Sequence, residues 1–232
     1  MKPGYTLLLV LSIAAAQSAV AQRGPVARTD LYHVLLAKAA PGKAAQMADA
    51  LKTPDPGAAM KGHLLILRHQ EGEDWDYAMI EHLGTKATVD AAAPSTPPAV
   101  RDLFAWHSDT FVTGPAWPVF AHALGLDPAS KTGGSVYVLS IYRVVPGHRD
   151  QLESALAEPP NPADKTAGLV LLQHLEGGPW QYLTITRYNS WTDFGASESS
   201  SVANTAKGSG GWFQMREHAA FHTDTLADRI AP

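Results

Sequence analysis

The sequence predicts an α+β fold built from two tandem copies of one unit. The first observation is an internal repeat, in which Pro41-Gly42 recurs as Pro146-Gly147, 105 residues later. Further residues recur in order at the same spacing, and the pairs are Gln46 and Gln151, Leu51 and Leu156, Trp75 and Trp180, and Tyr77 and Tyr182. The segment 101–111 then parallels 216–226 at a spacing of 115, so the second copy is the longer one. An ordered series of matches indicates a duplication.

Each copy shows the same order of elements. A strand runs into Pro-Gly and an amphipathic helix that prolines end, and then come an apolar strand, a Glu-Gly turn and a third strand. The expected ranges are 31–38, 43–51, 63–69 and 75–83 in the first copy, and 136–143, 148–156, 169–174 and 180–188 in the second. The run Leu64–Leu67 does not alternate, which predicts a strand covered on both faces.

The end of each copy is expected to be a helix carrying His107-Ser-Asp-Thr or His222-Thr-Asp-Thr. For a short fourth strand the first copy offers Val119–Leu124, and the second copy leaves almost no room for one. The extra residues of the second copy, Ser197–Gly211, are rich in Ser and Gly and predict a flexible surface loop. Because mobile loops commonly gate sites, a lid is one interpretation of this loop, and a neutral surface insertion is the other.

Strand, helix, strand, strand and helix make up most of a ferredoxin-like unit. With the tandem arrangement and the His-bearing last helix, the chain resembles the dimeric α+β barrel superfamily, which includes antibiotic-biosynthesis monooxygenases, EthD-like and NIPSNAP-like proteins. The resemblance covers a first unit at 30–113 and a second at 135–228, with 114–134 as the linker. It implies that the sheets of the two units pair into a barrel within one chain. We therefore expect a monomer as the basic unit.

Residues 1–21 are typical of a secretory signal peptide. Lys2 precedes an apolar stretch at 7–16, and Ala19-Val20-Ala21 supplies the small-x-small cleavage pattern. The sequence therefore predicts export to the periplasm or the medium, with Gln22 as the mature N-terminus. The apolar stretch is shorter than the roughly 20 residues of a membrane span, and no comparable stretch follows, so no transmembrane span is expected in the mature chain.

Composition excludes several classes of function. The 232 residues contain no cysteine, which removes disulfides and thiolate metal sites. The formal net charge is −4 and there are no runs of Lys and Arg, so nucleic acid is not an expected partner. The chain has no Gly-x-Ser-x-Gly, Walker loop, dinucleotide-binding turn or His-Glu-x-x-His, which disfavours hydrolases, kinases and nicotinamide enzymes.

His107 and His222 are candidate ligand-binding residues because both copies retain them. A neutral imidazole ligates haem iron or a divalent metal, or acts as a base, and the alternative is a histidine that only packs its helix. On a helix, the Asp two residues further on would point elsewhere, so no His–Asp couple is expected. His218 and His222 are spaced i, i+4, which would place both on one helical face as a possible metal site.

The first strands supply three more candidates. Tyr32, Val34 and Leu36 and their counterparts in the second copy predict a constant face packed by helices. His33, Ser140 and Tyr142 lie on the opposite face, which is taken to point inward, and scattered polar groups on an apolar face are typical of a ligand pocket. His69 and His174 each end a strand beside Glu-Gly, where turn geometry explains them without a function.

These observations favour binding of a small, largely apolar ligand in a cavity between the two repeats, with haem as one candidate. The first alternative is a cofactor-independent oxygenase or isomerase acting on a small aromatic substrate, polarised by His33, Ser140 or Tyr142. The second alternative is a structural or assembly protein of the cell envelope. Fold alone does not decide among the three hypotheses.

Overall fold

The computed structural model describes residues 26–53, 58, 60–89, 101–127, 134–209 and 211–231, and the predicted signal peptide lies outside this part of the chain. Four strands form the first unit: β1 (Asp30–Ala39), β2 (Leu64–Glu71), β3 (Tyr77–Gly84) and β4 (Phe104–Gly114). Four more form the second: β5 (Val136–Val144), β6 (Thr166–Glu176), β7 (Tyr182–Tyr188) and β8 (Ala219–Ala231). No helix in the described ranges is long and apolar enough to cross a membrane.

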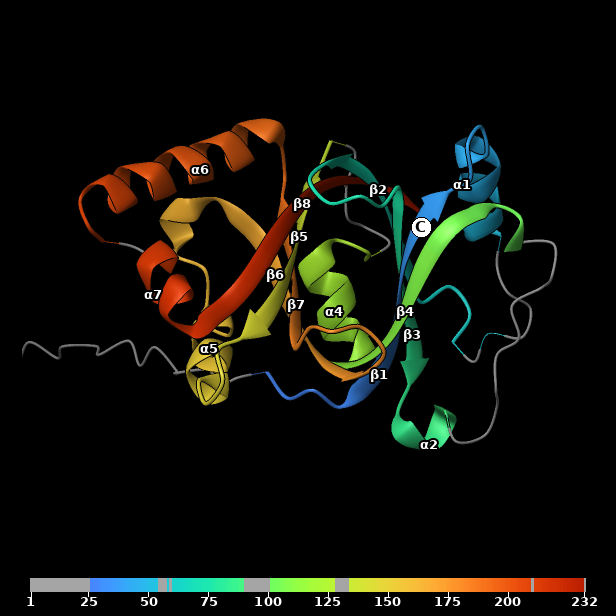
Figure 1. Ribbon diagram of the computed structural model, residues 1–232, viewed down its shortest axis with the longest axis horizontal. Coiled ribbons are helices and arrows are strands. Elements are labelled where there is room, and N and C mark those ends of the chain that lie inside the picture. The colour runs from blue at the N-terminus through green and yellow to red at the C-terminus, as the bar shows by residue number, and fades with distance from the viewer. Residues whose placement is uncertain are drawn as a thin grey trace, which may run out of the picture.

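The eight strands form one closed antiparallel barrel, in the order β1-β3-β2-β8-β5-β7-β6-β4 (Figure 1). Each unit has the ferredoxin-like order, which is β4-β1-β3-β2 in the first and β8-β5-β7-β6 in the second. The pairs β2–β8 and β4–β6 join the units and leave no free sheet edge. The fused barrel predicted from the duplication is therefore confirmed.

Helices cover the outside of this barrel. The first unit carries α1 (Ala44–Lys52) and the short α2 (Lys86–Val89), and the second carries α5 (Arg149–Leu156), α6 (Trp191–Ala206) and α7 (Gly211–His218). A 3₁₀ turn, η1 (Pro162–Asp164), precedes β6. The prediction of a loop at 197–211 was wrong, because α6 begins at a Ser190 N-cap that accepts a hydrogen bond from the Asp193 amide and continues through the serines.

The retained His-Ser/Thr-Asp-Thr segments are strands, not the helices that we expected. They lie in β4 and β8, the fourth strands of the two units. Buried and exposed residues alternate along them, so Thr110 and Thr225 are almost fully buried while Asp109 and Asp224 are exposed. This period of two, with β-branched threonine at the buried positions, favours a strand. The second unit thus has its fourth strand after all.

Val119–Leu124, the expected fourth strand of the first unit, belongs instead to the helix α4 (Trp117–Leu124) in the predicted linker. A proline in its first turn and Gly125 in the left-handed conformation at its end are both typical helix boundaries. Figure 1 shows α4 between the strands of the two units. Phe120 and Leu124 are fully buried in the central core. The helix therefore fills part of the barrel interior.

The inner and outer faces are the reverse of the prediction. Tyr32, Val34 and Leu36, with Tyr137 and Leu139 of the second unit, belong to the central core inside the barrel. Both tyrosines donate to the α4 segment, one to the Pro115 carbonyl at 2.6 Å and the other to the Leu124 carbonyl at 2.9 Å. The face that carries His33, Ser140 and Tyr142 therefore points outward, toward the helices.

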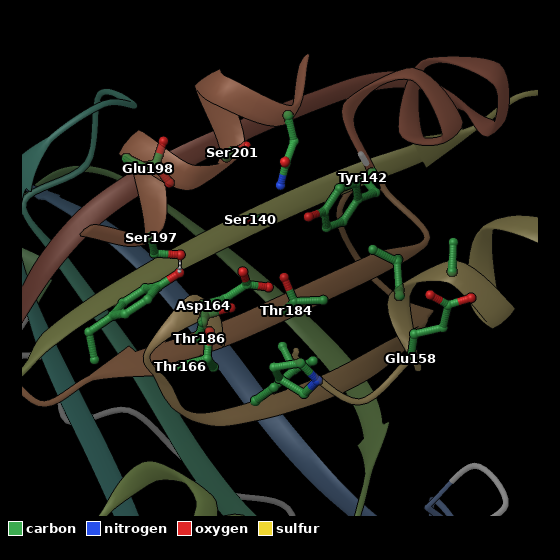
Figure 2. A pocket seen from close by; sticks show the side chains of 17 residues that line it. Ser140, Tyr142, Glu158, Asp164, Thr166, Thr184, Thr186, Ser197, Glu198 and Ser201 are labelled. Carbon is green, nitrogen blue, oxygen red and sulfur yellow. Dashed lines mark hydrogen bonds between the residues drawn. The ribbon is translucent and has the colours of Figure 1, made fainter. Parts of the chain in front are cut away.

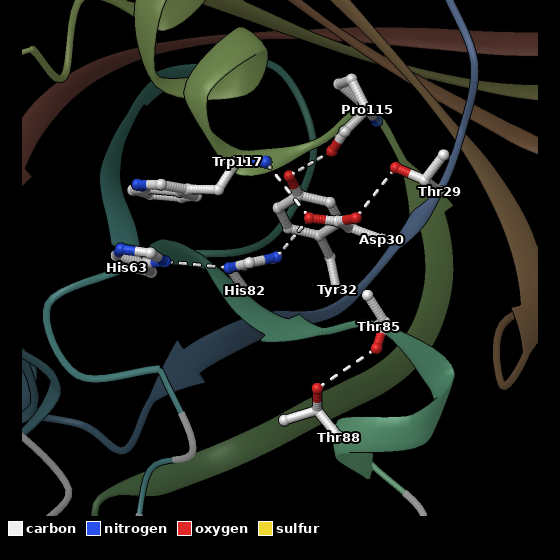
Figure 3. A network of polar contacts seen from close by, with 9 residues as sticks. All are labelled: Thr29, Asp30, Tyr32, His63, His82, Thr85, Thr88, Pro115 and Trp117. Carbon is white, nitrogen blue, oxygen red and sulfur yellow. Dashed lines mark hydrogen bonds and ion pairs between the residues drawn. The ribbon is translucent and has the colours of Figure 1, made fainter.

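A buried polar network holds the start of α4 (Figure 3). One carboxylate oxygen of Asp30 accepts from the Trp117 amide at 3.2 Å and from the His82 Nε2 at 2.8 Å. The Nδ1 of His82 in turn lies 2.9 Å from the Nδ1 of His63, whose ring stacks on Trp117 at 4.4 Å. Burial lowers the pKa of both imidazoles. The network connects the start of α4 to β1, to β3 and to His63, which directly precedes β2.

The apolar run at 64–67 and the two histidines beside Glu-Gly lie in β2 and β6. Leu65, Ile66 and Leu67 are all fully buried, which confirms a strand covered on both faces. His69 and His174 point their edges at Trp75 and Trp180, at 5.6 and 5.5 Å. The Nε2 atom of each of these histidines is buried without a hydrogen-bond partner in the described part of the chain.

Candidate functional site

A cavity of about 380 Å³ lies between the outer face of the second unit's sheet and the helices that cover it (Figure 2). The described residues that line it all belong to the second unit, and they are Ser140, Tyr142, Ala155, Leu156, Glu158, Pro160, Asp164, Thr166, Leu169, Thr184, Thr186, Tyr188, Ser197, Glu198, Ser201, Asn204 and Gly211. This cavity is not the one predicted between the two repeats, and apolar side chains, including those of α4, pack together in the barrel interior.

The floor of the cavity consists of strand hydroxyls. Ser140 on β5 lies directly opposite Thr184 on β7, and both side chains are almost fully buried. Tyr142 follows on the same face of β5 and also lines the cavity. Burial raises the pKa of Tyr142, and the neighbouring hydroxyls of Ser140 and Thr184 oppose this shift. Its phenol is therefore protonated at neutral pH and available as a donor.

The roof is made by one face of α6. Ser197 is buried there, with its hydroxyl 3.3 Å from that of Tyr188. Glu198 stands at the exposed rim, where partial burial and the negative charge of Asp224 raise its pKa. Since water screens an exposed carboxylate, we assign no catalytic role to this shift. The residues of the predicted loop thus form an ordered wall of the cavity.

Because the retained motif lies on a strand, its His and Asp share a face, which corrects the expectation that they would diverge. His107 Nε2 is 3.2 Å from a carboxylate oxygen of Asp109, and His222 Nε2 is 3.6 Å from Asp224. Only the first distance is short enough for a hydrogen bond. The duplicated motif therefore makes a His–Asp couple in the first unit and a looser pair in the second.

The structure separates the predicted ligand residues into two groups. Ser140 and Tyr142 line the cavity, and His222 lies beside it, with its ring parallel to that of Tyr142 at 5.9 Å. His33 and His107 lie on the outer face of the first unit, where His33 Nε2 is 2.8 Å from Asp109. These two histidines cannot act in the cavity of the second unit.

The proposed metal pair of His218 and His222 is not formed. The helix α7 ends at His218, and His222 lies on β8. His218 instead places its Nδ1 3.0 Å from the Nδ1 of His148. No group of three or more His, Asp or Glu residues suited to a metal ion occurs among the described residues.

Haem does not fit the cavity. Its propionates carry negative charge, yet the described lining includes Glu158, Asp164 and Glu198 and contains no Lys, Arg or His. An axial imidazole is also missing from the lining, because His222 packs behind Tyr142. We therefore derive no chemistry through haem.

The sequence analysis did not identify the cavity residues that follow α5 or those on α6. Glu158, Pro160 and Asp164 follow α5, and Ser201 and Asn204 lie on α6. The polar positions of α6 share a helical face, so a 3.6-residue period among its serines was the available signal.

Three solved structures cover nearly the whole chain at low sequence identity. An anthrone oxidase-like protein is 13% identical, with a TM-score of 0.52 over 88% of this chain and 92% of its own. A candidate monooxygenase from Lactobacillus acidophilus is 8% identical, with a TM-score of 0.51 over 87% and 94%. Another, from Fusobacterium nucleatum, is 8% identical, with a TM-score of 0.54 over 87% and 93%.

These likenesses concern the fold alone. The three structures are dimeric α+β barrel proteins, as the resemblance of the sequence predicted. No protein-family model matches the chain, and no curated protein matches it.

Proposed function

We propose that this chain binds a small polar molecule in the cavity between the second unit's sheet and α6. The observation that carries the proposal is the hydroxyl-rich lining, with Ser140, Tyr142 and Thr184 converging on the floor. A hydroxyl group can both donate and accept hydrogen bonds, so the three together offer several positions for a polar ligand. A ligand with hydroxyl, carbonyl or amine groups would use that capacity.

The first unit supports this interpretation, because it shows what the fold requires at the same positions. Leu35 and Met79 form the strand pair that corresponds to Ser140 and Thr184. The fold thus tolerates apolar side chains at this level of the sheet. Polar groups near the floor of a cavity cost free energy unless something pairs with them, and a bound ligand explains their presence.

The test is to fill the cavity from its roof. Ser201→Trp on α6 places an indole in the cavity without touching the floor, and Ser199→Trp is the matched control, because Ser199 lies on the same helix but does not line the cavity. We expect a small molecule to co-purify with the wild type and the control from the native host, and to be absent from Ser201→Trp. Denaturing extraction and mass spectrometry measure this. Equal loading of the two variants, or no bound molecule in any of them, contradicts the proposal.

A proton-transfer enzyme acting on a small aromatic substrate is the second candidate. The observation in its favour is Tyr142, a phenol kept protonated by burial and able to donate to a carbonyl or phenolate oxygen in the cavity. Tyr142→Phe would then abolish turnover of hydroxylated aromatic compounds, measured as product formation, while binding persists. If the wild type binds these compounds without converting them, the enzyme hypothesis is wrong and binding alone is supported.

We also propose that residues 1–21 direct export of this protein. N-terminal sequencing of the mature chain from its host is expected to begin at Gln22. Retention of Met1 in the accumulated protein contradicts export by cleavage.

A further inference from the structure

We infer that the ligand of the second unit's cavity is an organic cation bearing hydrogen-bonding groups, such as an amino sugar or a polyamine. This inference rests on the proposed function and adds the chemical class of the ligand. It is carried by the charges around the cavity, which all have one sign. Glu158 follows α5, Asp164 lies on η1, and Glu198 lies on α6, so three separate elements each contribute a carboxylate.

The protein does not neutralise these three charges. Within the ranges that the structure describes, none of the three side chains makes an ion pair or accepts a hydrogen bond from another side chain, whereas acids elsewhere are matched. Glu153 pairs with Arg28, and Asp228 pairs with Arg68 at 2.8 Å. Among the described residues that line the cavity there is no basic side chain. The unpaired charges around the cavity therefore leave a place for a cation from solution.

Neighbouring charges increase the preference for a cation. Asp224 lies on β8 next to the site, and its negative charge raises the pKa of Glu198. Such a carboxylate is stabilised in its charged form by a positive group nearby. An anion entering the cavity would meet three lining carboxylates, and like charges repel each other.

The hydroxyl groups in the lining restrict the chemical class of the ligand further. A bare metal ion would need a cluster of converging ligands, and the described residues form none. Ser140, Thr184 and Tyr142 instead add neutral donors and acceptors to a lining that also contains the three acids, and Figure 2 shows Asp164 beside Thr184 and Thr186. At about 380 Å³ the cavity is at the lower end of the range for small-molecule sites. A molecule with both amine and hydroxyl groups satisfies both sides.

The experiment compares probes that differ in charge but not in shape. Glucosamine, glucose and glucuronate are isosteric apart from one substituent, and spermidine serves as a flexible cation. Binding is measured by calorimetry on the full mature chain. We expect glucosamine or spermidine to bind about tenfold or more tightly than glucose, with glucuronate showing no binding. Added salt should weaken the cation complexes.

Charge variants complete the test. Asp164→Asn combined with Glu198→Gln is expected to weaken cation binding about tenfold or more, while glucose binding stays unchanged. Asp109→Asn on the first unit is the control and should change neither. If glucose equals glucosamine and the acid variants have no effect, while Ser201→Trp still blocks binding, the ligand is not a cation but the cavity is a site. If no probe binds and Ser201→Trp displaces nothing from the purified protein, both proposals fail.

Discussion

Replacing Phe120 with alanine tests whether α4 is part of the hydrophobic core of the barrel. Phe120 is fully buried and stacks on Tyr32 at 4.8 Å and on Trp117 at 5.4 Å. Truncation of a buried phenylalanine costs about 3–5 kcal/mol, and its two aromatic contacts place the expected loss in the upper part of that range. Since 1 kcal/mol shifts Tm by about 2–4 °C in a protein of this size, we expect a decrease of roughly 8–20 °C.

The control is Val119→Ala, on the same helix one residue earlier. Val119 is 47% exposed, so its truncation is expected to cost less than about 0.5 kcal/mol. Urea unfolding followed by circular dichroism and by tryptophan fluorescence gives the free energy, and agreement of the two probes checks two-state behaviour. A Phe120→Ala variant as stable as Val119→Ala would refute the placement of α4 inside the barrel.

Two further predictions follow from the same core. Burial lowers the pKa of His63 and His82 below 6.5, so the unfolded chain binds these protons first and stability should fall as pH drops through about 6.5. His82→Gln is expected to make the free energy of unfolding less dependent on pH, by at most about 1.4 kcal/mol per pH unit, and an unchanged slope between about pH 7.5 and 5.5 contradicts this. A fragment 22–130 exposes the edges of β2 and β4 and the apolar inner face, so it should dimerise or aggregate. A folded monomer in sedimentation would contradict the shared barrel.

The duplication made the architecture predictable. A repeated ferredoxin-like unit has two exposed sheet edges, and joining β2 to β8 and β4 to β6 removes all of them at once. The first three strands and the first helix of each unit were found within a few residues of their expected ranges, because prolines and glycines mark their ends. These signals are local, so the sequence alone contains them.

The fourth strands were missed for a physical reason. Phe104–Phe111 has Trp106 and Phe111 on opposite faces, and both are more than a third exposed, so neither face is clearly apolar. The partners that bury this strand are β1 and β6, and β6 begins more than fifty residues later. Non-local pairing overrides local propensity in such a segment.

The sequence prediction exchanged the inner and outer faces of the sheet because both faces are covered. Helices bury one face and the opposite unit buries the other, so an apolar pattern does not tell them apart. The retained tyrosines, Tyr32 and Tyr137, are inside because each donates its hydroxyl to a backbone carbonyl of the α4 segment, an acceptor that only the folded linker provides. On the first strands, the residues that match between the units point into the shared core, and the residues that differ lie on the outer faces.

The second unit differs from the first in two features that form its cavity. Its outer face replaces Leu35 and Met79 with Ser140 and Thr184, and its longer connection between the third and fourth strands forms α6 and α7 above them. Neither change alone makes an enclosed polar site. A helix over an apolar face would pack closely against it, and hydroxyl groups without a covering helix would face water. The two changes together enclose a hydroxyl-lined space. The ligand that we propose for this cavity would account for the occurrence of both changes in the second unit.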